Sequence, residues 1–167
     1  MFINVETTGH IEAVEALAKE IWTEHYTPII GREQVEYMLA RFQSELAISE
    51  QIADGYLYFL IEDMGQFIGY ISVQPKDGEL FLSKIYVRSS SRGMGHGRKA
   101  IDFAEELARE QGAGKIVLTV NKKNTLALKA YEAIGFRKIE AIVQDIGGGF
   151  VMDDYRMELE IEARSKR

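Results

Sequence analysis

The 167-residue sequence contains no cysteine and only two prolines. Without cysteine it can form no disulfide, no thiolate metal site and no cysteine nucleophile. Its three histidines are scattered along the chain, so we expect no metal site. The lack of cysteine is consistent with a cytoplasmic protein.

Long apolar runs and excess positive charge are also missing. No segment approaches the ~18 to 20 apolar residues of a membrane-spanning helix, and the first residues do not resemble a signal peptide. The net charge is −6, with 20 lysines and arginines against 26 aspartates and glutamates. Because a nucleic-acid binder needs a basic surface, we expect no nucleic-acid partner. Because the sequence has no long apolar segment, we expect no membrane partner either. Length and composition predict a single globular domain over residues 1–167.

Hydrophobic periodicity and turn residues predict the order of the elements. The expected strands are residues 2–5, 56–62, 66–74, 80–87, 115–120, 136–144 and 150–161. The expected helices are one after a Thr7-Thr8 cap, then 32–42, 45–53, the stretch after a glycine-rich loop, and Asn124 or Thr125 to Ile134. Because a strand, a helix and another strand follow in turn, the strand 115–120 should lie parallel to, or near, the strand 80–87. The polar tail from residue 162 should be frayed. This order predicts an α/β (α+β) fold, with a central mixed, mainly antiparallel sheet and helices on both faces.

A glycine-rich loop follows the strand 80–87. It reads Arg92-Gly93-Met94-Gly95-His96-Gly97-Arg98, and the segment 88–99 carries four basic residues and no carboxylate. Free N–H groups at a helix start attract anions, and glycine lets a phosphate approach the backbone. The loop predicts an anion site, for which a phosphorylated cofactor is the natural ligand.

The commoner nucleotide motifs do not fit this loop. Its glycines alternate, unlike G-x-G-x-x-G, and no Gly-Lys-Ser/Thr completes a Walker loop. It does fit Arg/Gln-x-x-Gly-x-Gly/Ala. That pattern alone is weak, and a glycine-rich turn without a ligand is the alternative.

A second motif follows about thirty residues later. Residues 124–136 read Asn-x-x-Ala-x-x-x-Tyr-x-x-x-Gly-Phe. With both motifs, their spacing and the element order, the chain resembles the GNAT superfamily of N-acetyltransferases, which bind acetyl-coenzyme A. The resemblance covers nearly the whole chain.

The resemblance implies how acetyl-CoA would be held. The backbone from residue 92 to 98 would bind the pyrophosphate; these residues are Arg92, Gly93, Met94, Gly95, His96, Gly97 and Arg98. The preceding strand would splay from its parallel neighbour and offer its edge to the pantetheine arm through Ile85, Tyr86 and Val87. A backbone N–H near Val87 would polarise the thioester carbonyl. Asn124 would bond the cofactor arm, although a plain helix N-cap explains the same residue.

Tyr131 is the best catalytic candidate. A phenol of pKa ~10 can protonate a leaving thiolate whose thiol has a pKa of ~8 to 9. The alternative is a core aromatic on a helix face. The absence of cysteine favours direct transfer in a ternary complex. A non-catalytic acyl-CoA-binding regulator and a nucleotide-phosphate module of another fold are the competing classes; Tyr131 and the missing motifs argue against them.

The general base is not identified by the sequence. An acceptor ammonium must lose a proton before it attacks. The candidates are Glu24, His25, Tyr26, Glu79 and Asp145.

The acceptor should be a primary amine. Relatives that acetylate protein N-termini carry a glutamate where this chain has Thr119, which disfavours a peptide acceptor. The closer likeness is to bacterial spermidine/spermine N-acetyltransferases of the PaiA type, in the Trp22–Tyr26 turn, the strand 85–87 and the ending 150–155. Asp153 and Asp154 could attract a polyamine, or be simply solvated. Protein amines and other small amines stay open. Family members are often dimers, and the largely apolar last strands would suit a homodimer.

Overall fold

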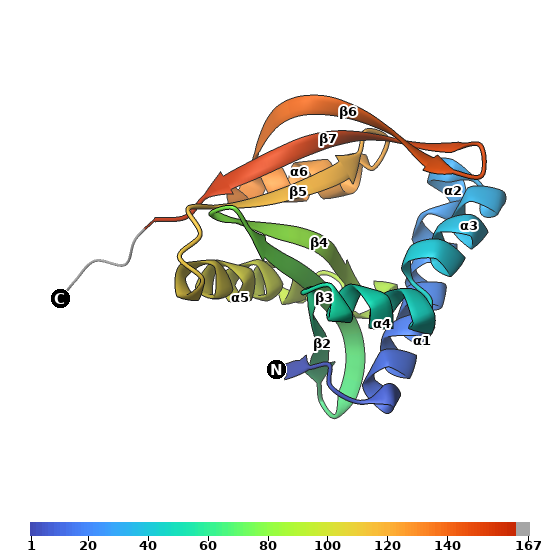
Figure 1. The fold of residues 1–167 in the computed structure, drawn as a ribbon, viewed down its shortest axis with the longest axis horizontal. Coiled ribbons are helices and arrows are strands. Elements are labelled where there is room, and N and C mark those ends of the chain that lie inside the picture. The colour runs from blue at the N-terminus through green and yellow to red at the C-terminus, as the bar shows by residue number, and fades with distance from the viewer. Residues whose placement is uncertain (163–167) are drawn as a thin grey trace. The chain divides into compact units, whose positions relative to one another are not determined.

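Seven strands form one mixed, mostly antiparallel sheet in the order β1-β2-β3-β4-β5-β7-β6 in the computed structural model, which describes residues 1–162 (Figure 1). The strands are β1 (Phe2–Asn4), β2 (Leu57–Asp63), β3 (Gln66–Lys76), β4 (Glu79–Val87), β5 (Lys115–Asn121), β6 (Arg137–Gly147) and β7 (Phe150–Glu160). The helices within this range are α1 (Thr8–His25), α2 (Thr27–Ile30), α3 (Arg32–Phe42), α4 (Glu45–Ala53), the 3₁₀ turn η1 (Ser89–Ser91), α5 (His96–Glu110) and α6 (Thr125–Ile134). The predicted class and element order are confirmed, while most of the tail expected to be frayed lies outside the described residues.

The chain groups into two compact units, each described here by itself. Unit 1 comprises residues 1–73 and 84–100, and unit 2 comprises residues 74–83 and the chain from 101 onward. The end of β4 and the start of α5 therefore belong to unit 1, whereas β5, α6 and the last two strands belong to unit 2.

In unit 1, antiparallel β1, β2 and β3 lie with four helices. The α1 helix begins where Thr7 caps it, because the Thr7 hydroxyl accepts the His10 N–H at 3.1 Å. One face of α1 is buried, from Val14 to Trp22, and the helix packs against α3 and α4 (Figure 1). The short α2 was not predicted. Pro28 lies in the first turn of α2, where the missing N–H of proline costs no hydrogen bond. Proline is therefore compatible with the start of this short helix.

The turn before β4 is tighter than predicted. We expected residues 75–78 to form it, but β3 continues through Pro75 to Lys76. Asp77 and Gly78 make the turn, with φ of 52° and 77°. Two central residues with positive φ match the twist of the flanking strands better than a turn that begins at Pro75 would.

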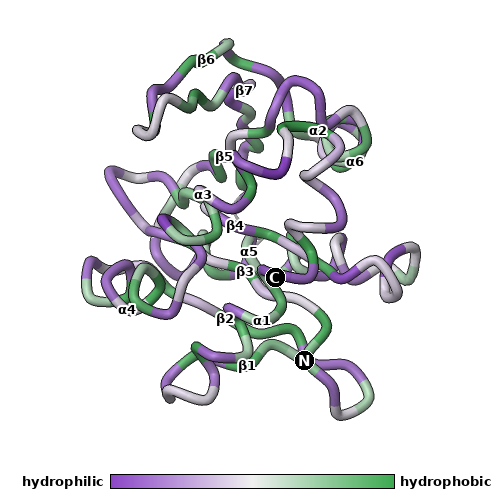
Figure 2. Tube along the Cα trace, turned by 90° about the vertical axis from the view of Figure 1, so that its right-hand side faces the viewer, coloured by the Kyte–Doolittle hydropathy of each residue, from purple (hydrophilic) through white to green (hydrophobic). Residues whose placement is uncertain are grey.

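In unit 2, β5 lies between β4 and β7. Glu79–Phe81 of β4 pairs in parallel with Lys115–Val117, which confirms the predicted parallel neighbour. The apolar residues of β5 are buried, as expected for a central strand. Antiparallel β7 and β6 complete this side of the sheet, and hydrophilic and hydrophobic residues follow one another along β6 (Figure 2). The homodimer expected from these last strands stays a prediction.

Candidate functional site

The end of β4 and the start of α5, in unit 1, carry the predicted anion-binding residues. The helix begins at His96, earlier than we expected, so that Gly97 and Arg98 lie in its first turn instead of the loop. First-turn N–H groups have no partner within a helix. Gly93 and Gly95 have φ of 78° and 83°, a conformation that favours glycine.

The glycines of this loop lie under open space. A Cβ built on Gly93, Gly95 or Gly97 would meet no atom within 4 Å. The loop residues Arg92 and Met94 are exposed as well. A phosphate group could therefore reach the backbone here, and the residues fit the predicted anion site.

The positive charge around the loop is smaller than the sequence suggested. Arg88 is held by Glu20 through hydrogen bonds of 2.6 Å and 3.0 Å. This pairing lowers the pKa of Glu20 and raises that of Arg88. Arg92 donates to the Val87 carbonyl at 3.2 Å and so ties the loop to the end of β4. Arg98 and Lys99 are exposed on the first turn of α5.

The ring of His96 does not face solvent. Its side chain is 11% exposed, and its Nε2 lies 3.6 Å from an Asp63 carboxylate oxygen. Only the backbone of His96 remains a candidate contact for an anion.

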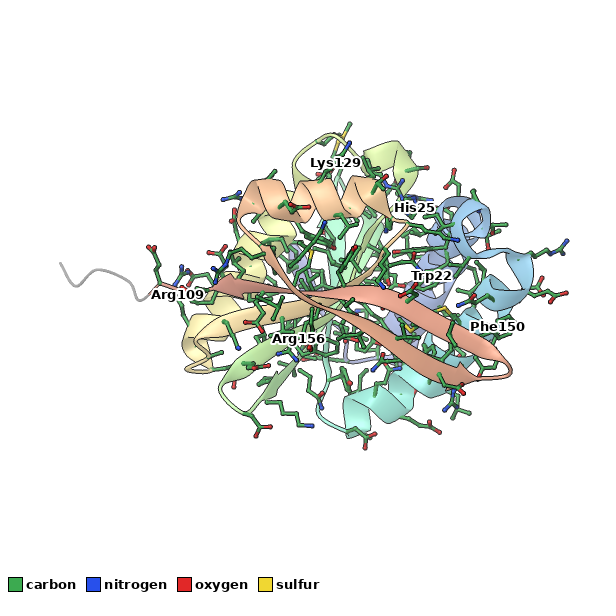
Figure 3. The ribbon with its side chains drawn as sticks, turned by 90° about the horizontal axis from the view of Figure 1, so that it is seen from above. Trp22, His25, Arg109, Lys129, Phe150 and Arg156 are labelled. Carbon is green, nitrogen blue, oxygen red and sulfur yellow. The ribbon has the colours of Figure 1, made fainter. Side chains whose placement is uncertain are left out.

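An aromatic cluster surrounds Tyr86, next to the end of β4. The Tyr86 ring lies 5.6 Å from that of Trp22, 6.2 Å from Tyr26 and 5.4 Å from Tyr70. Trp22 and Tyr26 stack at 4.3 Å, and Trp22 lies near the end of α1 with His25 (Figure 3). The Trp22 Nε1 and the Thr27 hydroxyl are buried without a hydrogen-bond partner in the described chain. The structure thus brings Tyr86, a predicted cofactor residue, together with the Trp22–Tyr26 turn, which carries three of the candidate bases.

Two candidate bases lie close to this cluster. Both oxygens of Glu24 lie 3.1 Å from the Ser89 hydroxyl, which donates to this exposed carboxylate. The His25 ring packs edge-on against Tyr26 at 4.8 Å. Both residues sit at the C-terminal end of α1 in unit 1.

The α6 helix, in unit 2, carries the second motif. Asn124 is 4% exposed and caps the helix, since its side chain accepts the Ala127 N–H at 3.4 Å. Gly135 ends the helix with φ of 124°. The ring of Tyr131 is half-buried and packs edge-on against Phe136 at 5.5 Å. Tyr131 thus lies on the helix that Asn124 begins.

Of the three remaining candidate bases, Tyr26 belongs to the aromatic cluster, and Glu79 and Asp145 have structural partners. Glu79 pairs with Lys115 at 3.3 Å and with Arg156 at 3.5 Å, in a network that Glu158 completes. Arg156 is labelled on β7 in Figure 3. Asp145 accepts the Gly147 N–H at 2.8 Å and so shapes the end of the β6–β7 hairpin. These contacts make neither carboxylate a good base.

Asp153 and Asp154, which the sequence pairs as possible polyamine-binding residues, differ in exposure and in their partners. Asp153 is exposed and pairs with Lys122 at 2.6 Å. Asp154 is 3% exposed, which excludes a solvated role for it. The pKa of Asp154 is raised to about 6, chiefly by burial and in part by the charge of Asp153, while Lys122 opposes the rise. The alternation of a strand would have separated the two residues, because neighbours point to opposite faces.

No three acidic, histidine or cysteine side chains among residues 1–162 are placed to hold a metal ion. Within the same residues, no helix is both long and apolar enough to cross a membrane.

Comparison with known proteins identifies the family. Residues 12–136, which include both motifs, match the pattern of the Acetyltransferase (GNAT) family. An uncharacterized N-acetyltransferase, YobR of Bacillus subtilis (strain 168), is 28% identical over 119 residues, covering 71% of this chain and 46% of YobR. Streptothricin acetyltransferase of Streptomyces lavendulae is 33% identical over 86 residues, covering 50% of this chain and 46% of that protein. The chain thus spans about half the length of these curated relatives.

The fold is shared with solved structures. The crystal structure of PaiA N-acetyltransferase from Thermoplasma acidophilum, in complex with coenzyme A, superposes with a TM-score of 0.79 at 19% identity. The match covers 96% of this chain and 99% of that one. With a family pattern matched from residue 12 to residue 136, the chain belongs to the Acetyltransferase (GNAT) family.

Proposed function

We propose that this chain is an acetyl-CoA-dependent N-acetyltransferase and that its two units form one catalytic domain over residues 1–167. The observation that carries the proposal is the open glycine loop at the start of α5. Three glycines there leave room above the backbone, and the start of a helix directs its first N–H groups away from the helix toward a bound anion. The pyrophosphate of acetyl-CoA is an anion of the kind that such a loop binds.

The edge of β4 would hold the pantetheine arm and the thioester. Ile85 and Val87 alternate with Tyr86 along the strand, so their side chains point away from the aromatic cluster. In this proposal the Val87 N–H donates a hydrogen bond to the thioester oxygen as negative charge develops on it. Asn124 adds a contact to the arm while it caps α6.

The reaction is direct transfer in a ternary complex. The neutral acceptor nitrogen attacks the thioester carbon, and a tetrahedral intermediate forms with its charge on oxygen. The attacking nitrogen, which has become positive, loses a proton to solvent as the C–S bond breaks. The Tyr131 hydroxyl gives its proton to the departing thiolate and regains one from solvent, so that an amide and coenzyme A result. Because the chain has no cysteine, a thiol cannot carry the acetyl group between the two substrates.

A cationic primary amine is the proposed acceptor, with a polyamine such as spermidine or spermine as the leading candidate. The net charge of −6 and the carboxylate of Glu24 favour a cation. Tyr26 and Tyr86 are half-buried, and aromatic residues of this kind attract an ammonium. A peptide amine, another small amine, and a regulator that binds acyl-CoA without turnover are the alternatives.

Two measurements test the proposal. Isothermal titration with acetyl-CoA, coenzyme A, ATP and NAD should show binding of the first two alone; no binding of acetyl-CoA at micromolar concentration would refute it. Thiol release should then be followed with spermidine, spermine, amino acids, aminoglycosides and a peptide. Turnover of the peptide but not of the polyamines would show that the acceptor is a peptide amine. Binding of acetyl-CoA without any turnover would favour a regulator that binds acyl-CoA.

A further inference from the structure

Asp154 is a buried carboxyl that the proposed reaction has not yet used. It is 3% exposed, and no residue of the described chain forms an ion pair or hydrogen bond with its side chain. Burying a carboxylate without a partner is costly. Among the described residues only the charge of Lys122, which pairs with Asp153, opposes that cost, and this suggests a role for Asp154 in chemistry.

The strand register places Asp154 beside the start of the α6 segment. Asp154 pairs with Asn121, the last residue of β5. The Asn121 carbonyl accepts the Asn124 N–H at 2.9 Å, and the Lys122 N–H donates to the Asp153 carbonyl at 3.1 Å. Paired residues on antiparallel strands have Cα atoms about 4.5 to 5.5 Å apart. Asp154 therefore lies at the end of β5 where the motif from Asn124 to Tyr131 begins.

The alternation of β7 sets the direction of the carboxyl. Leu159 lies on the α6 side of the sheet, because its Cδ1 is 3.3 Å from where a Cβ on Gly135 would be. The pairing from residue 154 to 160 has no bulge, so residues of even number point to the opposite side. Arg156 and Glu158 are on that side with Glu79. Asp154 thus faces away from α6, the helix that carries the proposed acid.

We infer that Asp154 is the general base that takes the proton from the acceptor ammonium. The inference rests on the proposed transferase function. The step is R–NH₃⁺ plus the Asp154 carboxylate giving R–NH₂ plus the protonated Asp154, after which the nitrogen lone pair attacks the thioester carbon. The base acts on the acceptor nitrogen, and the acid acts on the thioester sulfur. These two atoms are different substituents of the carbon under attack, so the base and the acid must lie at different positions around it. Opposite sides of the sheet provide them for Asp154 and Tyr131.

The surroundings of Asp154 suit this task. Its pKa of about 6 leaves it ionised at neutral pH but more basic than an exposed aspartate. The charged neighbours are Asp153 and Arg156 on β7 and Lys122 after β5, and the paired residues Asn121 and Ile142 carry no charge. Lys122 is occupied by Asp153, and Arg156 by Glu79 and Glu158. An incoming ammonium would therefore be the first cation to pair with Asp154.

The test compares Asp154→Asn with Asp153→Asn, which alters the adjacent exposed carboxylate. With spermidine as acceptor, kcat and kcat/KM are measured from pH 5.5 to 9. We expect Asp154→Asn to lower kcat by roughly 10²-fold or more and to abolish the acidic limb near pH 6. The Kd for acetyl-CoA should stay within about twofold of wild type, because the cofactor loop is untouched. Asp153→Asn should keep most of kcat and an acidic limb, which moves to lower pH because Asp153 no longer raises the pKa of Asp154. If wild type uses another amine of the panel instead, the comparison is made with that amine.

Other results would overturn the inference. An acidic limb that survives in Asp154→Asn, or a higher KM with unchanged kcat, would make Asp154 at most a binding residue. A measurement on wild type guards against misfolding of the variant: carboxyl NMR in the complex with coenzyme A should show one aspartate titrating near pH 6 whose pKa falls when spermidine is added. An unchanged titration refutes the inference. Failure of the proposed function is distinct, since wild type would then neither bind acetyl-CoA nor release thiol.

Discussion

Gly69 on β3 lies so close to β4 that a Cβ built on it would be 2.2 Å from the Tyr86 carbonyl oxygen and 3.1 Å from the Val87 Cα. Just beside this contact, the Arg88 N–H donates to the Ile68 carbonyl at 2.8 Å. The peptide between Tyr86 and Val87 is the one whose N–H we assign to the thioester oxygen. Glycine at position 69 therefore sets where that N–H lies.

Gly69→Ala should consequently act on catalysis as well as on stability. The methyl group cannot fit at 2.2 Å, so the Tyr86–Val87 peptide must shift. Losing one oxyanion donor costs about 10²- to 10³-fold in kcat, and we expect a tenfold or larger loss. The free energy of unfolding should fall by about 1 to 3 kcal/mol, as for overpacking. Gly114→Ala is the control, because a Cβ there meets no atom within 4 Å. Unchanged kcat in a folded Gly69→Ala protein would count against the role of Val87.

The importance of Gly69 could not be read from the sequence. A single glycine within a strand pattern signals a close approach only in general terms, and its partner is distant along the chain. Features that depend on neighbouring residues were predicted correctly. The bounds predicted for the helices at 32–42 and 45–53 match those of α3 and α4. The Ser44 cap explains the start of α4, since its hydroxyl accepts the Ala47 N–H at 3.2 Å.

Long-range pairing is what the sequence concealed. Arg88 was counted as free positive charge because nothing local marks Glu20 as its partner. Asp154 was grouped with Asp153 although the alternation of the predicted strand places neighbours on opposite sides of the sheet; its burial was what the sequence did not show. The roles of the cofactor loop, Asn124 and Tyr131 came from two motifs with fixed spacing, and they stay predictions that the following experiments test.

Gly95→Ala should weaken acetyl-CoA binding. Gly95 has φ of 83°, and an L-residue in the left-handed region costs roughly 1 to 2 kcal/mol. If the loop relaxes to avoid this cost, its N–H groups no longer converge on the pyrophosphate, and we expect the Kd from isothermal titration to rise about tenfold. Gly112→Ala is a matched control: φ is 70°, a Cβ there is also unobstructed, and the residue follows α5. It should lower stability similarly and leave the Kd unchanged.

Tyr131→Phe should separate chemistry from binding. The ring packing against Phe136 is kept, so α6 and the acetyl-CoA Kd should be preserved. Only the proton donor is removed, and we expect kcat to fall by 10²-fold or so, with loss of the basic limb of the pH–rate profile. Tyr56→Phe, which removes a hydroxyl in unit 1, should change neither quantity. A Tyr131→Phe enzyme with wild-type kcat would show that water or another group protonates the thiolate.

Lys84 should make the stability of the fold depend on pH. Its Nζ is buried and donates to the Phe42 carbonyl at 2.5 Å, to Gln51 Oε1 at 3.0 Å and to the Tyr58 hydroxyl. Burial lowers the pKa of Lys84 to about 7, although these three acceptors favour the charged form. The folded-state pKa therefore lies below the unfolded value of 10.5. Between pH 7 and 10.5 the unfolded chain binds more protons, so this group makes the free energy of unfolding rise with pH.

Urea unfolding at pH 7 and pH 9 measures this effect. Wild type should gain up to about 2 kcal/mol between these values relative to Lys84→Met, at no more than ~1.4 kcal/mol per pH unit. The comparison is between pH values within each protein, so the hydrogen bonds that methionine cannot make cancel. Lys129→Met, on the exposed face of α6 (Figure 3), should behave as wild type. Parallel pH profiles for wild type and Lys84→Met would mean that Lys84 stays charged in the fold, held so by its three acceptors.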